Sequence, residues 1–231
     1  MSGRRIVTVD GTAGSGKSTL GRALALEFAL PLIDTGLFYR GMMVAAVRAG
    51  VDGRDADALA RLAQATVIDV PTDPDSHDGG VAVDGVPAGA MLRDPRHAPL
   101  LAAISSNSAV RAAVLDPQRA LAVDGAVAVG RDCGTVVFPH AAVKFYLQAP
   151  ESVRQQRRLD QLRAGGSLAD DRMLRAEVGD RDRADTDRTE SPLRPAEDAH
   201  LIDTAAMDVA AMVAHALRIC RDAGFAPPSR E

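Results

Sequence analysis

The sequence predicts an α/β protein of three layers, in which helices cover both faces of a central parallel sheet. Apolar strand-like runs alternate with helical segments along most of the chain, which is typical of βαβ units. One run, Ala126–Val129, is continuously apolar, as expected for a strand buried in a parallel sheet. A glycine-rich segment joins the first strand to the first helix. The length of 231 residues fits one such domain with insertions.

The glycine-rich segment reads Gly11-Thr-Ala-Gly-Ser-Gly-Lys-Ser18 and fits the G-x-x-x-x-G-K-[ST] template of a P-loop. Its glycines let main-chain amides converge on phosphate oxygens, and the following helix adds its positive end. Lys17 is expected to reach the β and γ phosphates of ATP, and Ser18 is the expected ligand of Mg²⁺. The residues expected to contact ATP are Gly11, Thr12, Ala13, Gly14, Ser15, Gly16, Lys17, Ser18 and Thr19.

The elements after this loop follow in chain order. The first helix ends at Pro31, Leu32–Asp34 is a short buried strand, and Thr35 can cap the next helix. The later expected elements are helices near 100–104 and from 108, strands at 126–129 and 143–147, a helix opened by Pro150, a strand at 200–203 and a helix at 209–221.

Residues 58–105 interrupt this alternation. Strands are expected at Thr66–Val70 and Val81–Val83, and Asp84-Gly85 is a two-residue hairpin signal. We expect a small antiparallel insert that is too short for a core of its own and packs on the parent domain. The expected organisation is a core of residues 1–57 and 106–225, a helical lid at about 154–190 within it, the insert at 58–105 and a flexible tail at 226–231.

Composition narrows the class of protein. The two cysteines have no metal-binding or disulfide spacing, so a reducing cytoplasm is expected. No apolar run reaches the roughly 18 residues that span a bilayer, and we expect no membrane partner. A net charge of −4 and an aromatic content of 3% argue against a nucleic-acid polymer as partner. We expect a monomer that binds small molecules.

Arginines on separate segments are placed to meet at the loop end of the sheet. They are Arg40, Arg111, Arg131, Arg181 and Arg188. A guanidinium binds phosphate oxygens in pairs and keeps its charge, so such a cluster is suited to hold an acceptor phosphate against ATP. A segment from Gly165 onward that carries some of these arginines would also exclude water. The arginines favour phosphoryl transfer to an acceptor that is itself a phosphate.

Several ordered motifs carry a resemblance to bacterial cytidylate kinases. They are Asp10-Gly-Thr-Ala-Gly-Ser-Gly-Lys-Ser18, Leu32-Ile-Asp-Thr-Gly-Leu-Phe-Tyr-Arg40, Gly130-Arg-Asp-Cys-Gly-Thr-Val-Val-Phe-Pro139, Arg181-Asp-x-x-Asp-x-x-Arg188 and Asp198-Ala-His-Leu-Ile-Asp-Thr204. The resemblance covers nearly the whole chain. It implies a P-loop fold with a nucleoside-monophosphate-binding insert and a lid, and ATP-dependent, in-line phosphorylation of CMP and dCMP.

The resemblance also implies residue roles. The CMP phosphate would be held by Arg40, Arg131 and Arg181, with Arg188 between the donor and acceptor phosphates. The cytosine edge would be read by Arg111 and Asp132, and the sugar hydroxyl by Asp185. Thr35 and Tyr39 would also belong to the acceptor site, and Arg157 and Arg158 would approach ATP. The implied catalytic residues are Lys17, Arg131, Arg181 and Arg188. An aspartate suits cytosine because it accepts from the exocyclic amine, which uracil lacks.

Two positions depart from the pattern that the resemblance implies. Val129 stands where the family usually has an acidic residue that would order Mg²⁺ or its waters, and Asp34 or Asp10 could substitute for it. Ala102 stands where the family tends to have a serine near the base.

Two other functions compete with this interpretation. One is another small P-loop kinase with a neutral acceptor, such as a shikimate or nucleoside kinase, in which Asp34 would contact a hydroxyl group. The arginine cluster favours a phosphate acceptor over a neutral one. The other is a nucleotide-binding regulatory module with weak catalysis, which the valine at position 129 motivates.

Overall fold

A computed structural model describes residues 5–76, 80–164, 185, 186, 188 and 190–228. Within these ranges no single helix is long and apolar enough to cross a membrane. One pair of helices, Pro95–Ser106 and Ser108–Ala120, passes that test together, by length and composition only, with a bend of 83° between them.

The main sheet confirms the predicted α/β architecture. Its strands have the order β2-β6-β1-β7-β8, and every neighbouring pair is parallel. The strands are β1 (Ile6–Gly11), β2 (Leu32–Asp34), β6 (Ala126–Gly130), β7 (Val143–Gln148) and β8 (His200–Asp203). In a parallel sheet all carboxyl ends lie at one edge, which is where ligands of such folds bind. The register places Asp10 beside Gly130, so the phosphate loop and the segment after β6 start as neighbours.

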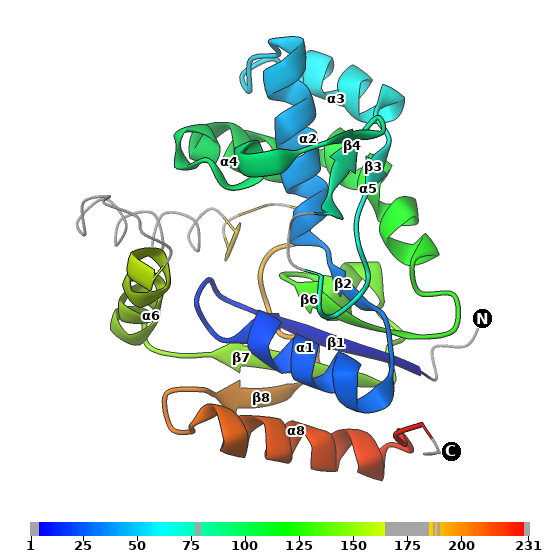
Figure 1. Cartoon of the computed structure of the whole chain (residues 1–231), viewed down its shortest axis with the longest axis vertical. Helices are drawn as coiled ribbons and strands as arrows, with labels where there is room; N and C mark the ends of the chain where they lie inside the picture. Colours follow the sequence, from blue (N-terminus) through cyan, green and yellow to red (C-terminus); the bar gives the residue numbers. More distant parts are fainter. Residues whose placement is uncertain (1–4, 77–79, 165–184, 187, 189, 229–231) are drawn as a thin grey trace.

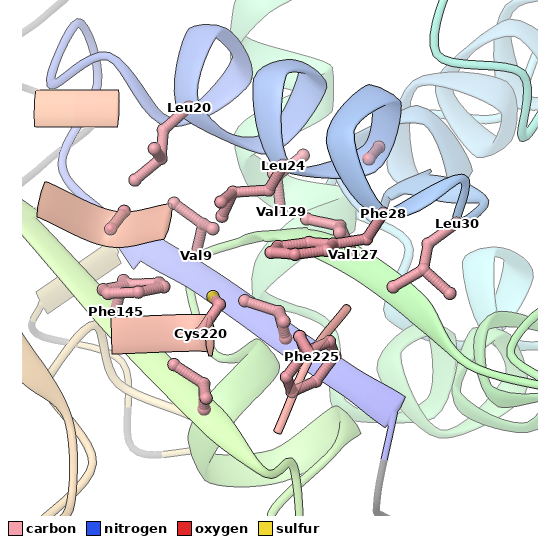
Figure 2. Packing of buried hydrophobic residues seen from close by; sticks show 14 of the residues in the cluster. Val9, Leu20, Leu24, Phe28, Leu30, Val127, Val129, Phe145, Cys220 and Phe225 are labelled. Carbon is pink, nitrogen blue, oxygen red and sulfur yellow. The ribbon is translucent and has the colours of Figure 1, made fainter. Parts of the chain in front are cut away.

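One face of the sheet is covered by α1 (Lys17–Phe28) and α8 (Val209–Asp222). Side chains of both helices meet the valines of β1 and β6 in one apolar cluster, which Figure 2 shows in close-up. The labelled members are Val9, Leu20, Leu24, Phe28, Leu30, Val127, Val129, Phe145, Cys220 and Phe225. This cluster fixes the start of α1, and with it the phosphate loop, over the end of β1.

The opposite face carries α5 (Ser108–Ala120) and a short π-helix at Cys133–Val137, hereafter the π-helix. Ile6 and Ala128 pack there against Val137 and Phe138. The residues of β1 alternate between the two faces, so Val7 and Val9 join the first cluster while Thr8 and Asp10 are buried on the side of the π-helix. A buried carboxylate thus lies under the π-helix.

A second group of elements packs around α2 (Gly36–Ala49), which extends from the main sheet into the upper part of the molecule in Figure 1. A three-stranded antiparallel sheet packs there, as predicted, with strands β3 (Ile68–Asp69), β4 (Ala82–Val83) and β5 (Val86–Pro87). The sheet shares one apolar cluster with the neighbouring helices. Those helices are α3 (Ala56–Ala65), α4 (Ala98–Ser106) and α5, and α6 (Glu151–Ala164) lies apart from them beside the main sheet.

The structure adds helix to the region that the sequence predicted as mainly β. Asp55 caps α3 by accepting from the amide of Ala58, and short 3₁₀ helices occupy Gly89–Arg93 and Pro95–His97. The strands themselves contain only two residues each. The alanine-rich run of α3 favours a helix, and its apolar residues Leu59 and Ala63 are four apart, on one buried side.

Thr35 does not cap α2 through its hydroxyl, and that expectation was wrong. Its backbone is helical (φ −63°, ψ −23°), and its Oγ1 donates to the carbonyl of Val129 at 3.1 Å. The amide of Gly36 instead donates to Oδ1 of Asp34 at 2.9 Å. The threonine therefore ties α2 to the end of β6.

Candidate active site

The phosphate loop runs from Gly11 to Ser18 between β1 and α1, as its motif predicted. Gly16 has a φ of 97°, and a Cβ built on Gly11 would lie 2.1 Å from the carbonyl oxygen of Leu147. Only glycine fits both conditions. The Lys17 ammonium donates to the carbonyl of Thr12 at 2.7 Å, so it lies folded over the loop. No side chain caps the start of α1, which leaves its positive end to the loop.

Arg154 of α6 holds this loop from the side. Its guanidinium donates to the carbonyl of Ala13 at 3.0 Å and to that of Ala149 at 2.9 Å, and the residue is only 6% exposed. A second arginine on α6, Arg157, donates to Oγ1 and to the carbonyl oxygen of Thr204, at 2.9 and 2.7 Å. The structure thus places Arg157 against the loop after β8. Its contact with ATP stays a prediction, and the side chain of Arg158 lies outside the described residues.

Val129 is the residue before the last of β6, faces α1 inside the apolar cluster, and is 2% exposed. A Cβ built on Gly21 would lie 2.3 Å from its Cγ1, so the helix and the valine are in close contact. Asp34 is the neighbour of Val129 in the sheet register and is half-buried. Within the described part of the chain, no cluster of three or more His, Cys, Asp or Glu could hold a metal ion. Asp34 is therefore the carboxylate next to the position that valine occupies.

The acceptor cluster, as we call Arg111, Arg131, Asp132, Asp185 and Arg188, gathers residues from α5, from the segment after β6 and from the segment before β8. Arg111 and Asp132 form an ion pair in which both side chains are buried. The guanidinium of Arg111 also lies 5.4 Å from the centroid of the Tyr39 ring, within the range of a cation–π contact. The carbonyl of Ser105 accepts from both Arg111 and Arg188, at 3.1 and 3.3 Å.

The second pair of the cluster joins Arg131 to Asp185. Nε of Arg131 donates to Oδ2 of Asp185 at 2.9 Å, and Oδ1 of that aspartate lies 3.6 Å from Arg188. Arg40 lies farther out on α2 and donates to the carbonyl of Leu92 at 3.0 Å. Arg181, also expected here, lies outside the described residues. The structure therefore brings together the residues expected to read the base, the sugar and part of the phosphate.

Some buried polar atoms at both ends of the site lack a hydrogen-bond partner among the described residues. They are Nε of Arg111, Nη2 of Arg188, Oγ1 of Thr12 and Oγ of Ser15, together with Oγ1 of Thr8 below the loop. A buried donor without an acceptor costs free energy, about 1–3 kcal/mol each. The first four line the phosphate loop and the acceptor cluster. They are suited to an oxygen-rich ligand that reaches from one to the other.

Asp10 connects the two ends. Its Oδ1 accepts from the amide of Cys133 at 2.9 Å, and its Oδ2 accepts from the amide of Gly134 at 2.7 Å. Asp10 directly precedes the phosphate loop, and Cys133 directly follows Asp132. From the sequence, Asp10 is also a possible carboxylate for the metal ion. Because each of its oxygens already accepts a main-chain amide, Asp34 is better placed for that role.

Burial controls the ionisation of this site. It raises the pKa of Asp10 from 3.8 to about 6, against the lowering effect of the two amides. Burial also raises the pKa of Asp132, which Arg111 and Arg188 oppose, and it raises the pKa of Tyr39 to about 12. The pKa of the Arg188 guanidinium is lowered by the same cause. Tyr39 is therefore neutral at neutral pH.

Sequence reasoning missed the residues that support the cluster. They are Asp10, the carbonyl of Ser105, Gln118 and Arg119, of which Arg119 donates to the carbonyls of Val136 and Val137. Asp10 carried a readable signal, because a carboxylate inside an apolar strand must find partners when it is buried. A main-chain carbonyl such as that of Ser105 carries no signal in the sequence.

Comparison with known proteins gives a consistent set of relatives. A sequence model described as cytidylate kinase matches residues 7–222. A cytidylate kinase of Granulibacter bethesdensis is 43% identical over 207 residues, which cover 89% of this chain and 91% of that protein. A cytidylate kinase of Mycobacterium avium is 40% identical over 217 residues, with 93% and 94% coverage. One from Pelotomaculum thermopropionicum is 39% identical over 208 residues, with 90% and 92% coverage.

Proposed function

The chain belongs to the cytidylate kinase family, and from this premise we propose how its residues carry out phosphoryl transfer from ATP to CMP or dCMP. The reaction is that of a nucleoside monophosphate kinase, which yields CDP or dCDP. A phosphate oxygen of the monophosphate attacks the γ-phosphorus of ATP, and the bond from that phosphorus to the bridging oxygen of ADP breaks. The protein contributes positions and charges, because this reaction requires little covalent chemistry from it.

Asp132 and Arg111 read the base in this proposal. The carboxylate of Asp132 accepts from the exocyclic amine of cytosine. The Nε of Arg111, which has no partner among the described residues, supplies a donor on the same edge. Uracil has a carbonyl where cytosine has the amine, so its oxygen would face the carboxylate. The buried ion pair makes this arrangement stiff, which sharpens the discrimination. Tyr39 supports the guanidinium of Arg111 through its ring, and Thr35 belongs to the same acceptor site and is bound to the carbonyl of Val129.

In this proposal, arginine side chains bind the phosphate of the nucleoside monophosphate. Arg131, Arg40 and Arg181 hold it, and Arg188 lies between it and the γ-phosphate. Asp185 now accepts from Arg131 at 2.9 Å, so the incoming phosphate competes with this carboxylate for the guanidinium. Asp185 is then released to accept from a sugar hydroxyl. An arginine aimed at the transferring group is worth about 10³–10⁵ in rate in related reactions.

Several features of the phosphate loop support ATP as its ligand. The loop has left-handed glycines and an uncapped helix start, and its Thr12 and Ser15 hydroxyls are buried without partners among the described residues. Ser18 and Asp34 would hold Mg²⁺, which usually takes one or two protein oxygens and completes its shell with phosphates and water. When bound, the ion neutralises charge on the β and γ phosphates. Arg157 and Arg158 belong to the ATP side.

Two buried guanidinium donors near the carboxylate of Asp132 support the proposal most strongly. They are Nε of Arg111 and Nη2 of Arg188, and neither has a hydrogen-bond partner among the described residues. A coupled assay with CMP, dCMP, UMP, AMP and shikimate as acceptors tests the proposal. We expect turnover with the cytidine nucleotides to exceed that with UMP and AMP, and none with shikimate. Equal rates with all nucleotides would contradict the proposal.

Val129 favours a second candidate function, a nucleotide-binding regulatory module with weak catalysis. An apolar residue fills the strand end at which a carboxylate would assist the metal. Measuring turnover against Mg²⁺ concentration separates the two functions. Tight nucleotide binding with negligible turnover at every Mg²⁺ concentration would select the regulatory module.

Location and oligomeric state are also part of the proposal. We propose a monomer located in the cytoplasm, and two free, buried cysteines are consistent with that location. Fractionation of the source cells and light scattering of the purified chain test these two points.

A further inference from the structure

The π-helix that follows Asp132 is held at both ends by ionisable side chains from other elements. At its start, the two carboxylate oxygens of Asp10 accept from the amides of Cys133 and Gly134. At its end, the guanidinium of Arg119 donates to the carbonyls of Val136 and Val137, at 3.0 and 2.9 Å. A helix start has free amides and a helix end has free carbonyls, so each charge has the sign that its end requires.

Apolar packing also holds the π-helix, through Cys133, Val137 and Phe138, but the acceptor residues themselves come before it. Arg131 and Asp132 lie between the last residue of β6 and the first of the π-helix. The carbonyl of Asp132 accepts from the amides of Val136 and Val137, at 2.8 and 3.2 Å, so this residue is bound into the π-helix through its own main chain. A shift of the π-helix therefore moves the base-reading carboxylate with it. A π-helix is rare and is often found at a functional site, where such a constraint has a use.

The position of Asp10 in β1 also links the π-helix to the centre of the main sheet. Asp10 is the last residue before the phosphate loop and is 4% exposed in a strand whose residues are all buried. The strand is fixed on both sides by β6 and β7. The rigid centre of the sheet thus sets the position of the segment that reads the acceptor.

We propose that Asp10 and Arg119 are positioning residues for the acceptor site, which hold the π-helix by its two ends and thereby place Arg131 and Asp132 against the monophosphate. The inference rests on the proposed function, because it names what fixes the site assigned there. Neither residue touches a nucleotide in this arrangement. Their loss weakens the binding and recognition of the acceptor and leaves the ATP loop in place.

The Asp10→Asn variant tests the first support. The amide side chain keeps one acceptor but turns an N–H₂ donor toward a main-chain N–H, so one bond is lost and a repulsion is added. We expect the KM for CMP to rise and the preference for CMP over UMP to fall, each on the order of ten- to a hundredfold. The KM for ATP is expected to stay within about twofold, because the loop amides that bind it are unchanged.

Thr8→Val is the matched control. Thr8 lies two residues earlier on the same side of β1, is fully buried, and its hydroxyl has no hydrogen-bond partner among the described residues. Valine has nearly the same shape, so this variant replaces a buried side chain of the same strand without removing a bond to the π-helix. We expect all its kinetic constants to match those of the wild type.

Arg119→Met tests the second support. Arg119 is partly exposed, so this variant is expected to fold even if the change at the buried Asp10 prevents folding. The KM for CMP is expected to rise about three- to tenfold, and Arg119→Lys is expected to restore most of it, because an ammonium can still donate to the carbonyls. Equilibrium binding of CMP and of ATP, measured by calorimetry on the same variants, is expected to follow the kinetic constants.

The outcomes separate the inference from the function on which it rests. Absence of wild-type turnover with CMP would refute the proposed function, and the calorimetric comparison would still decide the inference. Equal losses of CMP and ATP binding would overturn the inference, as would variants that melt at lower temperature but keep wild-type constants. Should Asp10→Asn fail to fold, unchanged CMP constants in Arg119→Met would overturn it alone.

Discussion

The two ends of the site are built in opposite ways. The phosphate loop is one continuous segment, Gly11–Ser18, and its proposed contacts with ATP come mostly from main-chain amides. The acceptor cluster consists of side chains from distant segments, and its arginines are already paired with carboxylates, Arg111 with Asp132 and Arg131 with Asp185. A main-chain site is set by local geometry, whereas a side-chain site depends on everything that holds its segments together. Substitutions near the acceptor are therefore expected to act over longer distances.

The largest effect is expected at the donor end, where one side chain is irreplaceable. Lys17→Ala removes the ammonium that we propose meets the β and γ phosphates, and we expect kcat to fall on the order of 10²–10³ while the KM for CMP changes little. Steady-state kinetics measure both constants. Arg22→Ala, on the exposed side of the same helix, is the control and is expected to stay within about twofold. Equal falls in both variants would refute the special role of Lys17.

The next effect tests the acceptor end. Asp132→Ala removes the proposed acceptor for the cytosine amine and leaves the Arg111 guanidinium without its buried partner, which costs about 3–5 kcal/mol of stability. We expect the ratio of kcat/KM for CMP over UMP to fall about ten- to a hundredfold, while ATP binding persists. Asp116→Ala on α5, an exposed carboxylate, is the control. An unchanged ratio in Asp132→Ala would show that other residues read the base.

A smaller effect tests whether the phosphate loop is as self-contained as the comparison suggests. Arg154→Met removes the donor to the carbonyl of Ala13, and we expect the KM for ATP to rise about tenfold with no change for CMP. Gln156→Ala, on the exposed side of the same helix, is the control. If ATP binding in Arg154→Met matches the wild type, the loop needs no support from α6.

The smallest effect concerns stability against pH. Because burial raises the pKa of Asp10 from 3.8 to about 6, the native chain binds more protons than the unfolded chain between about pH 4 and pH 6. The free energy of unfolding of the wild type, relative to Asp10→Asn, should therefore decrease as the pH rises through this window and level off above about pH 7. Urea unfolding at several pH values measures the difference. A difference that increases with pH would mean that the pKa is lowered.

The same contrast explains what the sequence could predict. The phosphate loop was legible because its function depends on glycine spacing and on a strand and a helix beside it, all within a short stretch. The parallel order of the main sheet was predicted from apolar strands that alternate with helices. Asp132 and Arg111 could be assigned only through the resemblance, since nothing local in α5 reveals that its arginine turns toward a residue 21 positions later.

The unpredicted parts depend on tertiary contacts. The hydroxyl of Thr35 reaches the carbonyl of Val129 instead of capping α2, because the end of β6 lies beside it in space. Helix α3 was not predicted, because the turn and hairpin signals that follow it in the sequence indicated an antiparallel β insert. The bond between the Asp10 carboxylate and the amide of Cys133 joins β1 to the π-helix. The two residues are 123 positions apart in the chain, so no local pattern could reveal this bond.

The buried thiol of Cys133 has a practical consequence. It is fully shielded from solvent, and its pKa lies well above its ordinary value because of burial and the nearby carboxylates. The thiolate is the nucleophile that attacks iodoacetamide, so native protein should resist this reagent at neutral pH until the chain opens at this point. The rate of labelling at Cys133, read by mass spectrometry, therefore reports how often the π-helix separates from β1 and the start of α2.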